Sequence, residues 1–309
     1  MSDRSNGVLG TPLDAETLEA IKTLEIEVRR TVEGLQGGGH ASHHVGASVE
    51  FSEHWRYAPG DDLRDIDWRA FARTDRYFVK RHEREVTLRC LLVGDCSASM
   101  GFRGTRAAVS KLRYTAVLLG AIAHVMVRQG DAVGLLLFAD RVIEHLPPRR
   151  NPDHLFALLS RLATVETPAG GGTDYSAAIR RAAEGAGRRG MIVIASDLWG
   201  AGHREEVALA SLASRGHDVA LFHLLSPDET DLPFDREAVF SGLENEGEVE
   251  VDPSRIREDY RRELEALRER WRRVTGEAGI DLIQAETSAP PEATLARFAA
   301  RRRRAGRAR

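Results

Sequence analysis

The chain between residues 88 and 100 reads Leu88-Arg89-Cys90-Leu91-Leu92-Val93-Gly94-Asp95-Cys96-Ser97-Ala98-Ser99-Met100. Its first half is an apolar run of strand length, with a predicted extent of 87–93, and its second half carries a carboxylate and two hydroxyls. In an open parallel sheet, ligands gather at the carboxyl ends of the strands. The stretch therefore predicts a buried strand whose end opens into a binding site.

Apolar runs of strand length alternate with amphipathic helices beyond this strand. Further strands are expected at 132–138, 141–146, 191–195, 218–224 and 280–284, and helices at 106–128, 154–162, 175–186, 204–214 and after Asp252. This alternation predicts an α/β fold, a doubly wound and mostly parallel six-stranded sheet covered on both faces. The link between the second and third strands is too short for a crossover, so we expect an antiparallel hairpin there, at a sheet edge.

The flanking segments have other patterns. Residues 14–34 carry an apolar stripe of Leu18, Ile21, Leu24, Val28 and Val32, which predicts an N-terminal helix. We divide the chain into 1–85, this helix with an irregular segment rich in aromatics and charges, and 86–309, the α/β domain. Within the latter, 226–251 is expected to be an inserted hairpin. The basic tail 297–309 is expected to be a solvated, frayed end, with binding of acidic partners as the alternative.

Composition excludes several function classes. There are 44 basic and 47 acidic residues, and a net charge of −3 gives no reason to expect a nucleic-acid or membrane binder. The longest apolar stretch, 116–127, is shorter than the ~18 residues of a membrane span, and the N-terminal residues lack the apolar core of a secretory signal. A cytoplasmic location without a membrane span is therefore expected. Cys90 and Cys96 are interpreted as buried, reduced fillers.

Five oxygen-bearing side chains form a candidate metal site, and they are Asp95, Ser97, Ser99, Thr173 and Asp197. The first three alternate after the first strand, so their oxygens face the same side of an extended loop. Thr173 follows a run of glycines, and Asp197 follows the strand at 191–195. Hard oxygen donors of this kind favour Mg²⁺ or Mn²⁺ over zinc. The alternative is that the hydroxyls cap helices and that Asp95 forms a buried turn.

The pattern D-x-S-x-S, a distant Thr and a distant Asp resembles the metal-ion-dependent adhesion site of von Willebrand factor A domains. This resemblance implies a von Willebrand factor A-like, Rossmann-like fold with the six strands in the spatial order 3-2-1-4-5-6. It also implies a metal that takes its last ligand from an Asp or Glu of a partner protein.

A second motif lies at 46–74 and contains the string Tyr57-Ala58-Pro59-Gly60-Asp61-Asp62-Leu63-Arg64-Asp65-Ile66-Asp67-Trp68. It resembles the signature of a bacterial family known as domain of unknown function 58. Members are similar to von Willebrand factor A proteins and are associated with MoxR-type AAA+ ATPases, so the resemblance implies such a partner and a role in remodelling or maturation of a client. Arg64, Asp67 and Arg73 are expected to form a structural charge network, with a separate binding site as the alternative.

Four histidines, His40, His43, His44 and His54, precede or lie within this motif. No cysteine accompanies them and their loop is rich in glycine. We therefore expect solvated loop histidines rather than a zinc site.

Three functions follow from these residues. We favour a non-enzymatic, Mg²⁺-dependent protein-binding module, since no nucleophile has an adjacent base in the sequence. An enzymatic rival is a phosphotransferase of the haloacid dehalogenase type, which also places an Asp after its first strand. Ser97 stands where that rival has a second acid, and Asp197 is a single acid where it has a pair. The third is a structural regulator with a degenerate metal site.

Overall fold

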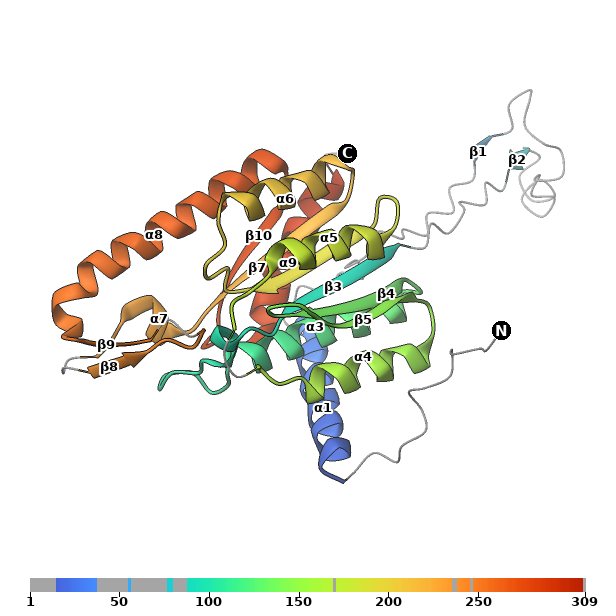
Figure 1. The fold of residues 1–309 in the computed structure, drawn as a ribbon. Coiled ribbons are helices and arrows are strands. Elements are labelled where there is room, and N and C mark those ends of the chain that lie inside the picture. The colour runs from blue at the N-terminus through green and yellow to red at the C-terminus, as the bar shows by residue number, and fades with distance from the viewer. Residues whose placement is uncertain are drawn as a thin grey trace, which may run out of the picture.

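The computed structural model describes residues 15–37, 55–56, 77–79, 88–168, 171–234, 238–244 and 247–307 (Figure 1). At its centre lies a six-stranded sheet in the spatial order β10-β7-β6-β3-β4-β5. The strands of this sheet are β3 (Arg89–Asp95), β4 (Ala132–Phe138), β5 (Val142–Arg149), β6 (Met191–Ser196), β7 (Asp218–Leu225) and β10 (Asp281–Glu286). Numbered along the chain within this sheet, the order is 3-2-1-4-5-6, so the predicted topology is confirmed.

All neighbouring strand pairs of this sheet are parallel except β4 and β5. That pair is the predicted edge hairpin, and a backbone hydrogen bond of 2.9 Å from the Ala139 N–H to the Arg141 carbonyl closes its turn. Because β3 lies between β4 and β6, the carboxyl ends of β3 and β6 are neighbours. This adjacency brings together the loops that carry Asp95 and Asp197.

Helices cover both faces of the sheet, as a doubly wound fold requires. One face is covered by α1 (Ala15–Gly37), α3 (Lys111–Arg128), α4 (Pro152–Thr164) and α9 (Pro291–Arg307). The other face is covered by α5 (Tyr175–Ala186), α6 (His203–Ser214) and α8 (Pro253–Ala278). In the described part of the chain, no helix combines the length and the apolar character that crossing a membrane demands.

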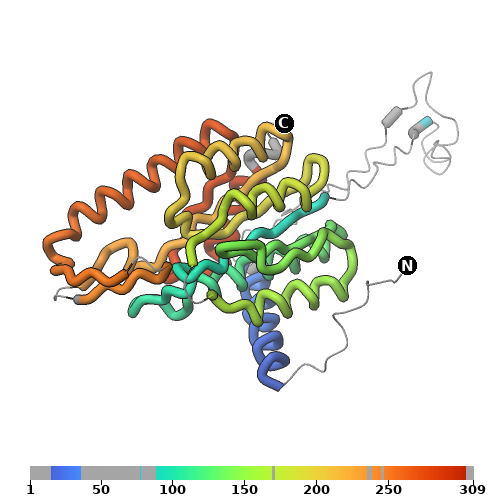
Figure 2. Tube along the Cα trace, viewed as in Figure 1, coloured from blue at the N-terminus to red at the C-terminus, as the bar shows by residue number. Residues whose placement is uncertain are grey.

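The N-terminal helix shares the core of the α/β domain, and Figure 2 shows α1 lying across α3 and α4. Leu24, Val28 and Val32 of the predicted stripe are buried in that core, whereas Leu18, which the stripe also included, is 37% exposed. A Cβ at Gly120 of α3 would come within 2.8 Å of Val28, so glycine permits the close approach of the two helices. The domain boundary at residue 85 stays a prediction.

The signature motif falls almost entirely outside the described residues. Only Trp55 and Arg56 of it are described, as strand β1 (Trp55–Arg56), which pairs antiparallel with β2 (Phe78–Val79). The predicted charge network and the four histidines also lie outside the described part of the chain, so both interpretations stay predictions.

The helix predicted at 106–128 begins later, at Lys111. Ser110 is its N-cap and accepts a hydrogen bond of 3.2 Å from the Arg113 N–H. Arg106 instead places its Nε 2.5 Å from Asp228 Oδ1, and the Thr105 hydroxyl donates to the same carboxylate at 3.1 Å. These long-range contacts hold the segment before Ser110 as a loop, which the apolar period alone does not reveal.

The insert at 226–251 contains the predicted hairpin and also a short helix that was not predicted. The helix is α7 (Pro227–Asp231), and the hairpin is β8 (Ala238–Ser241) with β9 (Glu248–Val251), which form a separate two-stranded sheet. The long helix α8 then begins as expected, because Asp252 accepts a hydrogen bond of 3.0 Å from the Ser254 N–H.

The expectation of a frayed basic tail is wrong for residues 297–307, which belong to a helix. Residues 291–307 form α9, in which Leu295 and Phe298 are buried in the core. Arg301 donates to the Leu282 carbonyl at 2.7 Å, and Arg302 forms an ion pair with Asp218. Apolar residues spaced between the arginines therefore dock the helix on the sheet, while Arg301 binds a backbone carbonyl of β10 and Arg302 binds a carboxylate of β7.

Candidate metal site

The loop after β3 gathers the first three candidate ligands. The Ser97 N–H donates to Asp95 Oδ1 at 2.9 Å, and the hydroxyl oxygens of Ser97 and Ser99 lie 3.1 Å apart. A single turn of 3₁₀ helix, Ala98–Gly101, holds Ser99 in place. All three side chains are buried, and the neighbouring Cys90 and Cys96 are buried and free, as predicted.

The end of β6 supplies Asp197 and a residue that the sequence reasoning missed, Ser196. The Ser196 hydroxyl donates to Asp95 Oδ2 at 2.6 Å and so links the ends of the two strands. Asp197 Oδ1 accepts from the Trp199 N–H at 3.1 Å. Leu198 between them has a φ of 58°, a left-handed conformation that a branched side chain rarely adopts. Ser196 could have been identified from the sequence, because it directly precedes Asp197 at the end of a predicted strand.

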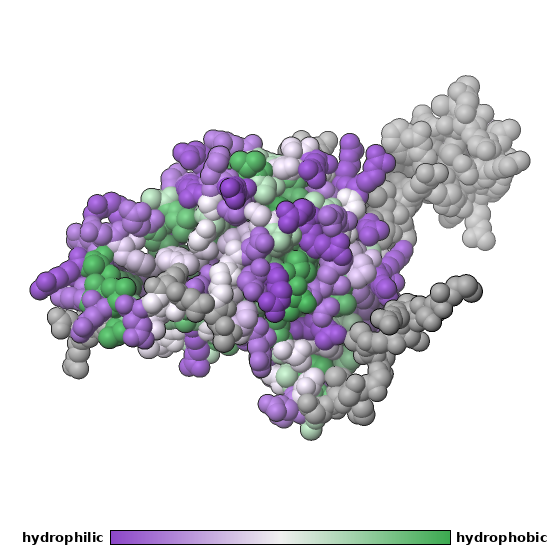
Figure 3. Space-filling model, in the orientation of Figure 1, coloured by the Kyte–Doolittle hydropathy of each residue, from purple (hydrophilic) through white to green (hydrophobic). Residues whose placement is uncertain are grey.

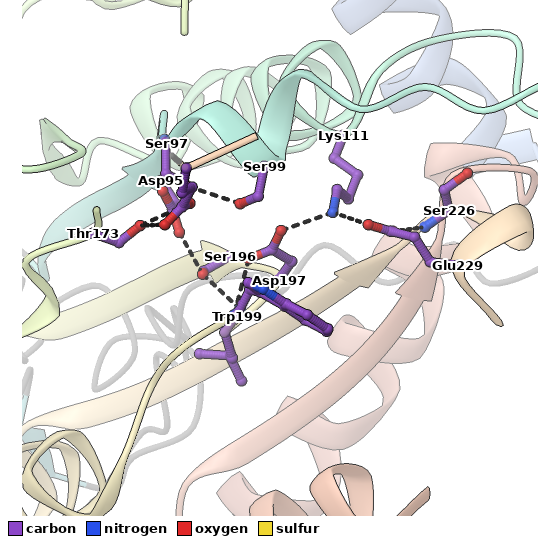
Figure 4. A network of polar contacts seen from close by, with 12 residues as sticks. Asp95, Ser97, Ser99, Lys111, Thr173, Ser196, Asp197, Trp199, Ser226 and Glu229 are labelled. Atoms are coloured by element: carbon purple, nitrogen blue, oxygen red, sulfur yellow. Dashed lines mark hydrogen bonds and ion pairs between the residues drawn. The ribbon is translucent and has the colours of Figure 1, made fainter. Parts of the chain in front are cut away.

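Thr173 lies at the rim of the site, just before Asp174, which caps α5. Gly171 has a φ of 101°, so the glycine is required for the turn that delivers Thr173. Figure 4 shows Thr173 beside Asp95 and Ser97. The five predicted residues are thus brought to one end of the sheet, four of them buried and Thr173 partly exposed.

Lys111, at the start of α3, is a member of the cluster that the sequence analysis did not identify. Its side chain is 1% exposed, and its Nζ lies 2.7 Å from Asp197 Oδ2 and 2.5 Å from Glu229 Oε1 of α7 (Figure 4). Burial opposes ionisation of Asp197, but the charge and hydrogen bond of Lys111 outweigh it and lower the pKa of Asp197. The sequence did offer one indication of its importance: lysine is rare in this chain, which has three lysines in all and uses arginine for its other basic residues.

Asp95 has no such charged partner among its hydrogen bonds. Its side chain is 0% exposed, and both donors to its oxygens, the Ser97 N–H and the Ser196 hydroxyl, are neutral. Burial, followed by the charge of Asp197, raises the pKa of Asp95 to about 7. The buried carboxylate therefore sits where a cation would relieve an unfavourable charge.

The donor set fits a divalent cation. If ionised, Asp95, Asp197 and Glu229 with the ammonium of Lys111 leave two negative charges, which one Mg²⁺ or Mn²⁺ would balance. All the donors are hard oxygens. The described residues contain no group of three His, Cys, Asp or Glu side chains placed to hold a metal, so a metal here needs the hydroxyls of Ser97, Ser99 and Thr173 as well.

Tyr175 fixes the loop that carries Asp197. Its hydroxyl lies 3.3 Å from the Ser196 hydroxyl and donates to the Trp199 carbonyl at 3.1 Å. Its ring packs edge-on against Phe138, with the centroids 5.7 Å apart. Burial, and then the charges of Asp95 and Asp197, raise the pKa of Tyr175, so the phenol stays a hydrogen-bond donor to this loop.

The chain thus has a von Willebrand factor A-like fold, a doubly wound sheet in this strand order with carboxylates and hydroxyls at the ends of two neighbouring strands. Residues 53–270 match the family described as "Protein of unknown function DUF58", and the chain belongs to this family. It is 31% identical over 294 residues to the uncharacterized protein Rv1480 of Mycobacterium tuberculosis (strain ATCC 25618 / H37Rv), which covers 94% of this chain and 91% of that relative.

Solved structures with related folds include BatB from Bacteroides thetaiotaomicron and the SpRpn10 VWA domain. BatB has 15% identity and a TM-score of 0.47, and the match covers 69% of this chain and 98% of that chain. The SpRpn10 domain has 13% identity and a TM-score of 0.39, with 68% and 94% covered. With scores this low, the likenesses add nothing to what the strand order itself defines.

Proposed function

We propose that this protein is a non-enzymatic, Mg²⁺-dependent protein-binding module. The observation that carries the proposal is the buried cluster at the ends of β3 and β6, where Asp95 has only neutral hydrogen-bond donors and lies beside a second buried carboxylate, Asp197. When bound, a divalent cation would supply a positive charge that attracts a carboxylate from another protein.

In such a site, each of the clustered residues would have its own role. Asp95 and Asp197 supply the negative charge that retains the cation, and each is held by backbone N–H donors from its own loop. The hydroxyls of Ser97 and Ser99 provide neutral oxygens, so the ligands leave the cation some positive charge. Thr173, the most exposed member, lies where an external side chain would approach.

The partner we propose is a MoxR-type AAA+ ATPase, with which the protein would remodel or mature a client in the cytoplasm. This choice rests on the resemblance of the signature motif to the family and on membership of that family. An acidic side chain of the partner would complete the metal site.

The phosphotransferase alternative has less support. Asp95, which would be its nucleophile, is fully buried, and each of its carboxylate oxygens accepts a hydrogen bond. That geometry suits a fixed ligand better than an attacking group. The alternative requires Mg²⁺-dependent turnover of a phosphate ester such as p-nitrophenyl phosphate that Asp95→Asn abolishes, and such turnover would replace our proposal.

Lys111 favours a second candidate, a structural regulator with a degenerate metal site. Its ammonium already neutralises Asp197 from inside the protein, at 2.7 Å. A site in which the Lys111 ammonium already pairs with a carboxylate could keep its structure without a bound metal. Calorimetric titration with Mg²⁺ separates the two candidates, because the degenerate site predicts no binding.

The test of the proposed function is binding of the immobilised protein to the MoxR-type ATPase of the same genome. Thr173→Ala should weaken binding about thirty-fold or more at saturating Mg²⁺ while thermal stability is retained, because a metal–carboxylate contact contributes about 2–5 kcal/mol. EDTA should have the same effect on the wild type. Thr164→Ala, which alters an exposed threonine of α4, is the matched control. Equal binding by wild type and Thr173→Ala would overturn the proposal.

A further inference from the structure

The turn of the β8–β9 hairpin points a carboxylate at the candidate metal site. Thr173 Oγ1 lies 3.2 Å from Glu244 Oε1 and 3.4 Å from Glu244 Oε2, so the hydroxyl is shared between both oxygens of one carboxylate. The two residues are separated by 71 positions in the chain. A side chain of the insert thus reaches the rim at the point where an external acid would approach.

The hairpin is a small element of its own. Its strands pair with each other and not with the central sheet, and a hydrogen bond of 2.7 Å from the Gly242 N–H to the Gly247 carbonyl closes its turn. Val239 and Val249 are 59% and 58% exposed, and Figure 3 shows apolar surface at this end of the molecule. Phe240 of β8 packs edge-on against Phe234, but no strand of the central sheet pairs with the hairpin, so the hairpin can move at a lower free-energy cost than a core strand.

We propose that Glu244 is an internal ligand of the metal site, a carboxylate that rests on the Thr173 hydroxyl in this structure and would move onto the cation when one binds. Its carboxylate takes the position that an acidic side chain of a partner would take, so the hairpin must swing aside before the partner binds. This inference rests on the proposed function, because it assigns Glu244 to the same site.

Charge supports this assignment. The carboxylate of Glu244 lies on the Thr173 hydroxyl, beside a site that already contains the carboxylates of Asp95 and Asp197. A bound divalent cation would offset the negative charge of these carboxylates and attract that of Glu244, so the contact between hairpin and site should tighten when the metal binds. A carboxylate from a partner would be attracted by the same charge, and the two would compete for one position.

The insert contacts the site from a second side as well. Glu229 of α7 pairs with Lys111, which in turn pairs with Asp197. The Tyr260 hydroxyl of α8 donates to the Glu229 carbonyl at 2.6 Å and anchors this end of the insert. The insert is therefore anchored at Glu229, while the turn of its hairpin contacts the site through Glu244 and Thr173, which is the arrangement that a displaceable internal ligand needs.

The experiment uses Mn²⁺ as the metal and acetate as the smallest carboxylate probe. Bound Mn²⁺ broadens the NMR signal of acetate that reaches it, so the linewidth reports whether the position is free. The full chain is compared with Glu244→Gln, Glu244→Ala and the control Glu250→Gln, which changes an exposed carboxylate on β9. Water proton relaxation in the same samples measures Mn²⁺ binding, and circular dichroism checks the fold.

We expect severalfold greater broadening of acetate in both Glu244 variants than in the wild type and Glu250→Gln. Loss of Mn²⁺ affinity confined to the Glu244 variants would equally assign this carboxylate to the metal. Equal broadening in all four proteins, with Mn²⁺ bound, would overturn the internal ligand and leave the proposed function standing. Absence of Mn²⁺ binding in the wild type would overturn the proposed function itself and the internal ligand with it.

Discussion

At the residue scale, Asp95 and Asp197 lie at the ends of two neighbouring strands, but their surroundings differ. Asp95 is buried with neutral donors only, whereas Asp197 faces the ammonium of Lys111 at 2.7 Å. Two buried carboxylates close to each other raise each other's free energy in the ionised form. Lys111 offsets part of this cost, and a divalent cation would offset the rest.

Replacing the buried ammonium should be costly. Lys111→Met keeps the length of the side chain but leaves Asp197 and Glu229 without their cation, so the free energy of unfolding should fall by about 3–5 kcal/mol. Urea denaturation in metal-free buffer measures this change. Lys22→Met alters an exposed lysine of α1 and should stay within about 0.5 kcal/mol of the wild type. A loss at Lys111 as small as that at Lys22 would contradict the buried ion pairs.

At the scale of elements, the sequence predicted the helices whose ends are determined by residues close to them in the chain. The bounds 175–186 of α5 match its structure, and α8 starts where Asp252 and Pro253 predicted. The start of α3, the short helix α7 and the docking of α9 were missed because each depends on contacts with distant residues. Asp228, for example, is separated from Arg106 by 122 positions.

The contact between Asp228 and the loop before α3 gives an element-scale prediction. Asp228 is buried and accepts from the side chains of Thr105 and Arg106, so Asp228→Asn should destabilise the protein by about 2–3 kcal/mol in thermal or urea unfolding. Asp231→Asn removes a more exposed partner of the same arginine and should cost about 0–1 kcal/mol. Equal effects of the two variants would show that the contact does not tether α7 to the loop.

The docking of α9 gives a second prediction at this scale. Phe298 is buried and packs edge-on against Phe222 of β7, with the ring centroids 5.3 Å apart. Phe298→Ala should lower the free energy of unfolding by about 3–5 kcal/mol, whereas Phe156→Ala, at an exposed position on α4, should cost less than about 1 kcal/mol. A frayed C-terminal segment would make both changes equally mild in urea denaturation.

At the scale of the whole molecule, the sheet topology makes the site. The sequence revealed Asp95, Ser97, Ser99, Thr173 and Asp197 because each follows a strand or a glycine-rich turn. It did not reveal Lys111 or Glu244, since their partners lie 86 and 71 positions away and only the fold brings them together. The placement of the oxygen-bearing side chains at the strand ends was therefore predictable, and the charged side chains that contact them were not.

The measurement that tests the central claim is calorimetric titration of the metal-free protein with Mg²⁺ and Mn²⁺. It is made on the wild type, Asp95→Ala and Asp140→Asn, the last being an exposed carboxylate on the β4–β5 turn. Near-UV circular dichroism confirms that each variant is folded. We predict one divalent cation bound per chain in the wild type and in Asp140→Asn, and no detectable binding in Asp95→Ala. Unchanged affinity in Asp95→Ala, or no binding in the wild type, would contradict the metal site.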